Sequence, residues 1–136
     1  MDAKIWKTGI GTAIGMGDSA YVANTLNSSL KQLPNESDDE FKQRKRKNII
    51  KYVGAGGLTG TLAGYGLSTG NYGMGATTLA GSLIGKGVGA GLTTKDSFKN
   101  MNAENQQKTI DNMAVGQTVG SIGGAGVGRL SMHKFK

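Results

Sequence analysis

The chain contains no cysteine, one histidine (His133) and one proline (Pro34) among its 136 residues. Without cysteine there is no disulfide and no zinc site of the cysteine and histidine kind, so we expect no metal and no cofactor. Hydrophobic residues make up only 37% of the chain and aromatic residues only 6%. This is little material for the aqueous core of an ordinary domain. The protein must therefore pack its elements in some other way.

Motifs for enzyme chemistry are also missing. The segment 80–87 has the general form of a phosphate-binding loop, but Ala80 replaces the first glycine and Gly87 replaces the serine or threonine. The neighbouring carboxylates Asp38, Asp39 and Glu40 are explained by the start of a helix. We therefore expect a protein that is not an enzyme, with no catalytic residue and no small-molecule substrate.

Glycine, with 24 residues, is what the chain has in excess, and in three places it recurs at every fourth position. Positions i, i+4 and i+8 lie on one face of a helix, so each run forms a stripe without side chains. Another helix can approach such a stripe closely. The predicted helix-packing residues are Gly56, Gly60, Gly64, Gly81, Gly85, Gly89, Gly116, Gly120, Gly124 and Gly128.

The pattern predicts an all-α fold that begins with an N-terminal helical segment over residues 1–33. Gly9, Ala13 and Gly17 form the small-residue line of this segment, and Pro34 ends it. Residues 34–51 form an acidic and basic linker that contains the next helix start. Ser37 and Glu40 have the spacing of a capping box there.

Residues 52–92 are predicted to form a glycine-zipper helical hairpin, which spans about 38–92 when the preceding helix start is included. Its first helix runs from Phe41 to the turn at 68–71, and its second covers 74–92. The alternation of glycine over 85–91 also suits non-helical structure in parts of 54–91. Residues 93–136 are predicted as a polar connection (93–102), a C-terminal glycine-zipper helix (103–130) and a basic tail.

The hairpin has no charged side chain between Tyr52 and Gly85. Each helix has about 17 residues, which is near the lower limit for crossing a hydrocarbon core. Basic residues lie before and after the hairpin and none lies in its turn, which would put both of its ends on the cytoplasmic side.

Positive charge is concentrated in the linker, within a formal net charge of +7. Such a cluster suits non-specific contact with phosphates of lipid headgroups or DNA. The candidate phosphate- or headgroup-binding residues are Lys42, Arg44, Lys45, Arg46, Lys47 and Lys51. Lys86, a charge within a glycine-rich helix, either lines a pore or extends to the membrane interface.

The runs 56–64, 81–89 and 116–128 resemble those of glycine-zipper membrane proteins. A small, cysteine-free chain with weak membrane helices also resembles the minor virion proteins that tailed phages eject into the host. That resemblance implies a virion protein that forms homo-oligomers through its zippers, contacts other virion proteins and the lipid bilayer, and helps form a genome-delivery conduit.

Its location would be the virion and then the host cell envelope. One alternative is a holin-like or toxin-like pore in a bacterial inner membrane. A second is a structural packing component of a phage particle that never meets lipid.

Overall fold

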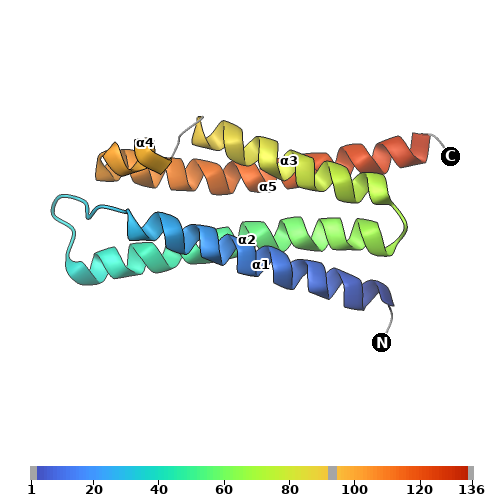
Figure 1. The fold of residues 1–136 in the computed structure, drawn as a ribbon, viewed down its shortest axis with the longest axis horizontal. Helices are drawn as coiled ribbons and strands as arrows, with labels where there is room; N and C mark the ends of the chain where they lie inside the picture. Colours follow the sequence, from blue (N-terminus) through green and yellow to red (C-terminus); the bar gives the residue numbers. More distant parts are fainter. Residues whose placement is uncertain (1–2, 92–94, 135–136) are drawn as a thin grey trace.

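The structure is a computed structural model that describes residues 3–91 and 95–134. The described residues confirm the all-α fold, with helices α1 (Ala3–Ser28), α2 (Asp38–Ser68), α3 (Tyr72–Ala90), α4 (Lys95–Asn100) and α5 (Ala103–Lys134). The four long helices lie along one axis (Figure 1). The loop 29–37 and α4 lie at one end of this bundle, which we call the loop end. The start of α1, the turn at 69–71 and the end of α5 lie at the other end.

Two antiparallel pairs, α1 with α2 and α3 with α5, have the closest packing, and α2 also contacts α3 and α5. The start of α2 is where the sequence placed it, whereas α3 begins at Tyr72, before the predicted start at residue 74. The capping box is confirmed, since the Glu40 backbone N–H donates to Ser37 Oγ at 3.2 Å and the Ser37 N–H donates to Glu40 Oε1 at 3.4 Å. Helix α2 then continues without a break to Ser68. Asn71 caps α3 by accepting from the Met74 N–H at 2.8 Å.

The non-helical alternative for parts of 54–91 is wrong outside the turn, because α3 remains helical to Ala90. Gly91 then ends the helix with a φ of 60°, a left-handed conformation that glycine adopts without a Cβ clash. Leu92, the predicted last residue of this helix, lies outside the described residues.

Helix α1 ends at Ser28, before the predicted boundary at residue 33. The last turn tightens, since Ser29 N–H donates to Leu26 O at 3.1 Å. The chain is then held by α5, because the Lys31 N–H donates to Gln106 Oε1 at 2.8 Å. This contact joins residues far apart in the sequence, so no local sequence pattern predicts it. The predicted polar connection contains the short helix α4, and α5 continues to Lys134, beyond the predicted end.

The two zippers of the predicted hairpin do not pack on each other. The α2 stripe packs on α1, where a Cβ on Gly60 would overlap the carbonyl oxygen of Gly11 and one on Gly56 would overlap that of Gly15. Within the small-residue line of α1, Gly9 and Gly17 face open space. The stripe of α1 that packs on α2 is Gly11, Gly15 and Ser19.

The α3 stripe packs on α5 in the same manner. A Cβ on Gly81 would overlap the carbonyl oxygen of Gly120, and one on Gly85 would overlap that of Gly116. Further along, Gly124 and Gly128 pack against Thr77 and Met74, and Gly89 packs against Asn112. Near the hairpin turn, α2 and α3 approach closely, at Gly66 and Gly75.

Replacing a stripe glycine should therefore cost stability. We expect Gly120→Ala to destabilise the fold by about 1–3 kcal/mol, because the added methyl group would overlap the Gly81 carbonyl oxygen. Gly123, on the same helix, faces open space, so Gly123→Ala should stabilise by up to about 1 kcal/mol through the higher helix propensity of alanine. Chemical denaturation followed by circular dichroism measures both. Equal effects of the two changes would show that α3 and α5 are not in close backbone contact.

Candidate functional site

The bundle has two unlike halves. Near the loop end, apolar side chains form an ordinary core. Its buried members are Ala23, Leu30, Tyr52, Phe98, Ile110 and Ala114. The other half contains the glycine stripes, and we call it the glycine half. It comprises the first half of α1, the second half of α2, most of α3 and the second half of α5.

In the glycine half the usual distribution of side chains is inverted. Polar side chains are buried: Thr78 and Ser121 are 0% exposed, and Thr59 and Ser82 are also buried. Large apolar side chains are exposed instead, with Leu83 at 69%. We call this exposed set the apolar exterior: Ile10, Ile14, Leu67, Leu79, Leu83, Ile84, Val88, Val115, Val119, Ile122, Val127 and Leu130. An exposed apolar patch of this extent is typical of an interaction surface.

Thr78 and Ser82 donate to backbone carbonyls of their own helix, whereas three other buried polar side chains bond to one another. Thr59 Oγ1 and Ser121 Oγ lie 2.6 Å apart, and Gln117 Nε2 donates to Thr59 Oγ1 at 3.3 Å. These bonds join α2 to α5 between the two helix pairs. No buried side-chain nitrogen or oxygen among the described residues lacks a partner. The interior is thus polar and satisfied, and it needs no water to complete its hydrogen bonds.

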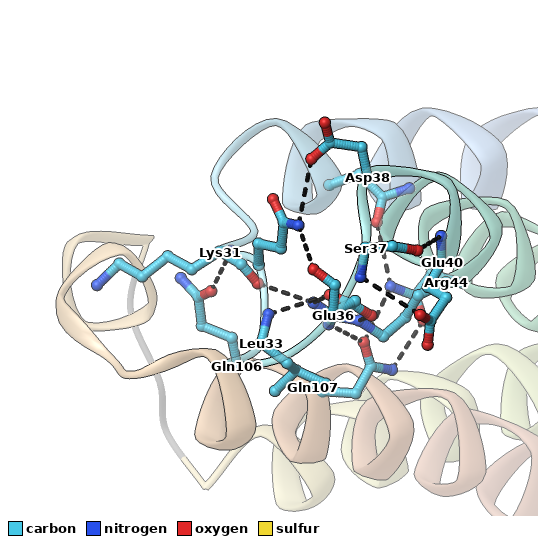
Figure 2. Close-up of polar contacts among 12 residues, drawn as sticks. Lys31, Leu33, Glu36, Ser37, Asp38, Glu40, Arg44, Gln106 and Gln107 are labelled. Carbon is cyan, nitrogen blue, oxygen red and sulfur yellow. Dashed lines mark hydrogen bonds and ion pairs between the residues drawn. The ribbon is translucent and has the colours of Figure 1, made fainter.

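The residues of the predicted basic cluster do not all face the same side, because they lie around helix α2. Arg44 faces inward: its Nε donates to Glu36 Oε2 at 2.9 Å, its Nη1 to Gln107 Oε1 at 2.8 Å and its Nη2 to Lys31 O at 2.8 Å (Figure 2). It is a structural residue that joins the loop, α2 and α5. It is not available to phosphates.

The other members of the cluster lie on or near the outer surface. Lys51 pairs with Asp111 at 2.8 Å, and the half-buried Lys45 lies over the Phe41 ring, with Nζ 4.4 Å from its centre. Lys42, Arg46 and Lys47 are exposed, and no ion pair holds them within the described chain. These three residues form the open basic face, which is the part of the predicted cluster that is free to contact anions.

Lys86 lies on the inner side of α3, where the two helix pairs meet. It is half-buried, and its Nζ lies 6.0 Å from the centre of the Tyr52 ring. Burial lowers the pKa of Lys86, and the negative charge of Asp18 on α1 opposes this shift. Burial also raises the pKa of the Tyr52 hydroxyl, helped by Asp111. Lys86 therefore lies between helices of a single chain. Its predicted role in a pore stays a prediction.

Sequence reasoning missed two features of this site. The inward Arg44 network requires Glu36 and Gln107, which are far apart in the chain, so only the fold brings them together. The polar interior is not evident from the sequence, because the burial of Thr59, Gln117 and Ser121 depends on how α2 packs on α5. Their spacing relative to the glycine stripes, on an adjacent helix face, was the available signal.

None of the helices among the described residues has both the length and the apolar character needed to cross a membrane. Comparisons with protein-family models, with curated protein sequences and with solved structures find no match to this chain.

The Arg44 network should make the stability of the fold depend on pH. The hydrogen bond from Arg44 lowers the pKa of Glu36 below its ordinary value of 4.5. A lowered folded pKa gives stability that is complete above the unfolded value and is lost as the pH falls through the folded value. As the pH falls from about 6 through the folded pKa of Glu36, the melting temperature of the native protein should thus fall toward that of Glu36→Gln.

Asp39→Asn, which removes an exposed carboxylate outside this network, is the control for acidification. Its melting curve should stay parallel to that of the native protein. A constant gap between the native protein and Glu36→Gln at all pH values would contradict the assignment of the carboxylate to this network.

Proposed function

We propose that this protein is a non-enzymatic, membrane-interacting protein whose apolar exterior contacts lipid. The observation that carries the proposal is the inverted distribution of side chains in the glycine half. Serine, threonine and glutamine are satisfied inside, whereas isoleucine, leucine and valine are outside. This arrangement suits apolar surroundings, where helices associate through small residues and interhelical hydrogen bonds.

The inverted distribution also bears on the weak hydropathy of the helices. Averages along each helix include the glycines and the polar residues that the bundle hides, such as Thr59 and Gln117. The outer surface of the glycine half is therefore more apolar than the hydropathy averaged along any one helix indicates. Moving one side chain such as Leu83 or Ile84 from water into hydrocarbon stabilises by about 1–2 kcal/mol at this exposure.

The distribution of charged residues also suits contact with a lipid membrane. Along α2, α3 and α5, charge-free stretches (52–68, 72–85 and 112–128) begin or end at the core and cover the glycine half of these helices. Each has about 14–17 residues, equal to about 21–25 Å of helix. The open basic face lies beyond this band, toward the loop end. Near an anionic surface each such cation contributes about 1 kcal/mol, so Lys42, Arg46 and Lys47 are placed to bind headgroups.

The setting in a virus particle, the delivery of a genome through a conduit and contact with other virion proteins remain proposals, supported by the resemblance of this small, cysteine-free chain to ejected minor virion proteins. The structure changes the expected route of assembly. Gly56, Gly60 and Gly64 already pack on α1, and the α3 and α5 stripes pack on each other. Copies of the chain would therefore meet through the apolar exterior, unless helices exchange between them.

The first test is flotation of the purified protein with liposomes, with and without anionic lipid, combined with dye release. We expect the protein to float and flotation to increase with anionic lipid. Lys42→Gln/Lys47→Gln should reduce the anionic dependence, because it removes two cations of the open basic face. Lys99→Gln/Lys108→Gln is the comparison: it removes two exposed lysines of α4 and early α5, at the same end of the bundle but outside the open basic face, and should reduce the anionic dependence less.

The outcomes separate the candidate functions. Flotation with dye release supports a conduit or pore, and death of producing cells on expression would then favour the holin-like or toxin-like alternative. Protein that stays at the bottom of the gradient with every lipid composition contradicts the proposal and favours a packing component of a particle.

A further inference from the structure

A groove runs between α1 and α3, over the contact of α1 with α2, and has a volume of about 700 Å³. Its walls are apolar and include Ile10, Ile14, Leu79 and Leu83. Volumes of about 300–1,000 Å³ with mainly apolar walls and few polar groups are typical of ligand sites. The floor is formed partly by Gly11 and Gly60, which have no side chains to fill it.

The polar side chains in the floor of the groove already have hydrogen-bond partners within the protein, so they do not require a polar ligand. Ser82 Oγ donates to Leu79 O at 2.8 Å, Gln117 Nε2 donates to Thr59 Oγ1 at 3.3 Å, and Thr59 Oγ1 lies 2.6 Å from Ser121 Oγ. Their hydrogen-bonding capacity is directed into the protein. The groove therefore offers a ligand an apolar channel along most of its length.

The length of the groove suits an extended occupant. From Lys7 to Asp18 it follows α1 for about 16 Å. With apolar walls along that length, it has room for one hydrocarbon chain.

One end of the groove carries a charge of each sign on facing helices. Asp18 lies on α1 and Lys86 lies on α3, and they form no ion pair with each other. Asp18 is exposed, and Lys86 is half-buried without a hydrogen bond to a carboxylate. A headgroup with both a phosphate and an ammonium group would complement both charges, with the phosphate toward Lys86 and the ammonium toward Asp18.

We propose that this groove binds one acyl chain of a zwitterionic phospholipid, with the headgroup between Asp18 and Lys86 and the chain extending toward Lys7. The proposal rests on the proposed membrane function, since it identifies the lipid that the glycine half would hold. It also assigns to Lys86 a contact with a headgroup in place of a pore.

The test is calorimetric titration of the full-length protein with lysophosphatidylethanolamine below its micelle concentration. We expect saturable binding of one molecule per chain. Affinity should be lower for lysophosphatidylglycerol, whose head is anionic, and for a monoacylglycerol, whose head is uncharged. Leu83→Asn should weaken binding by about tenfold or more, because it places an amide on the groove wall.

Ile84→Asn is the matched control, because Ile84 is the next residue on α3, is 66% exposed against 69% for Leu83, and does not line this groove. It should leave affinity within about twofold of the native value. Lys86→Gln should abolish the preference for the zwitterionic head over the uncharged one, whereas Lys47→Gln should not. Because all four side chains are at least half-exposed or replaced by a similar shape, the variants are expected to fold, and circular dichroism checks this.

Equal loss of affinity in Leu83→Asn and Ile84→Asn, absence of saturable binding, or preference for the uncharged head would each overturn the proposal. A change of oligomeric state in Leu83→Asn without lipid binding would also overturn it and assign the groove to a second copy. Failure here is distinct from failure of the membrane function. Native protein that floats with liposomes but binds no lysolipid overturns the groove proposal alone, whereas lysolipid binding without flotation overturns the membrane function alone.

Discussion

Backbone contact along the glycine stripes is the constraint on which the rest of this structure depends. In each helix pair, carbonyl oxygens of one helix occupy the space in which a side chain of the other would lie, as at Gly60 with Gly11 and at Gly85 with Gly116. Helices this close leave no room between them for large side chains. Most isoleucines, leucines and valines of the glycine half therefore lie on the outside, and the apolar exterior is a direct result of how the helices pack.

The two pairs meet through polar contacts, which gives the bundle specificity where its apolar packing is sparse. Thr59, Gln117 and Ser121 connect α2 to α5 in the glycine half. Near the loop end, Asn48 Nδ2 donates to Asn27 Oδ1 at 3.1 Å, and Gln107 Nε2 donates to Asn48 Oδ1 at 2.8 Å. Such side-chain bonds have strict geometry, so they fix the register of one pair against the other. They also keep polar groups satisfied away from water, which is what an apolar environment requires.

The proposed function rests on the separation of charge and apolar surface along one axis. The open basic face lies toward the loop end, the apolar exterior lies beside the glycine stripes, and the groove with Asp18 and Lys86 lies where these regions meet. A lipid surface has the same order, with charged headgroups beside a hydrocarbon layer. The same geometry explains why Arg44 differs from its neighbours: it points inward to Glu36, while Lys42 and Lys47 point out.

The sequence by itself determined the local features: the all-α class, the capping box at Ser37 and Glu40, the turn at 68–71, and the positions of the glycine stripes on α2, α3 and α5. These depend on helix periodicity and on contacts within a few residues. The tertiary structure alone decided which stripe packs on which, that α1 uses Gly11 and Gly15 instead of Gly9 and Gly17, and which basic residues are free. A glycine stripe specifies close approach but carries no side chain to choose a partner. The choice depends on contacts between distant residues, such as Gln106 with Lys31 and Thr59 with Ser121, which exist only once the chain is folded.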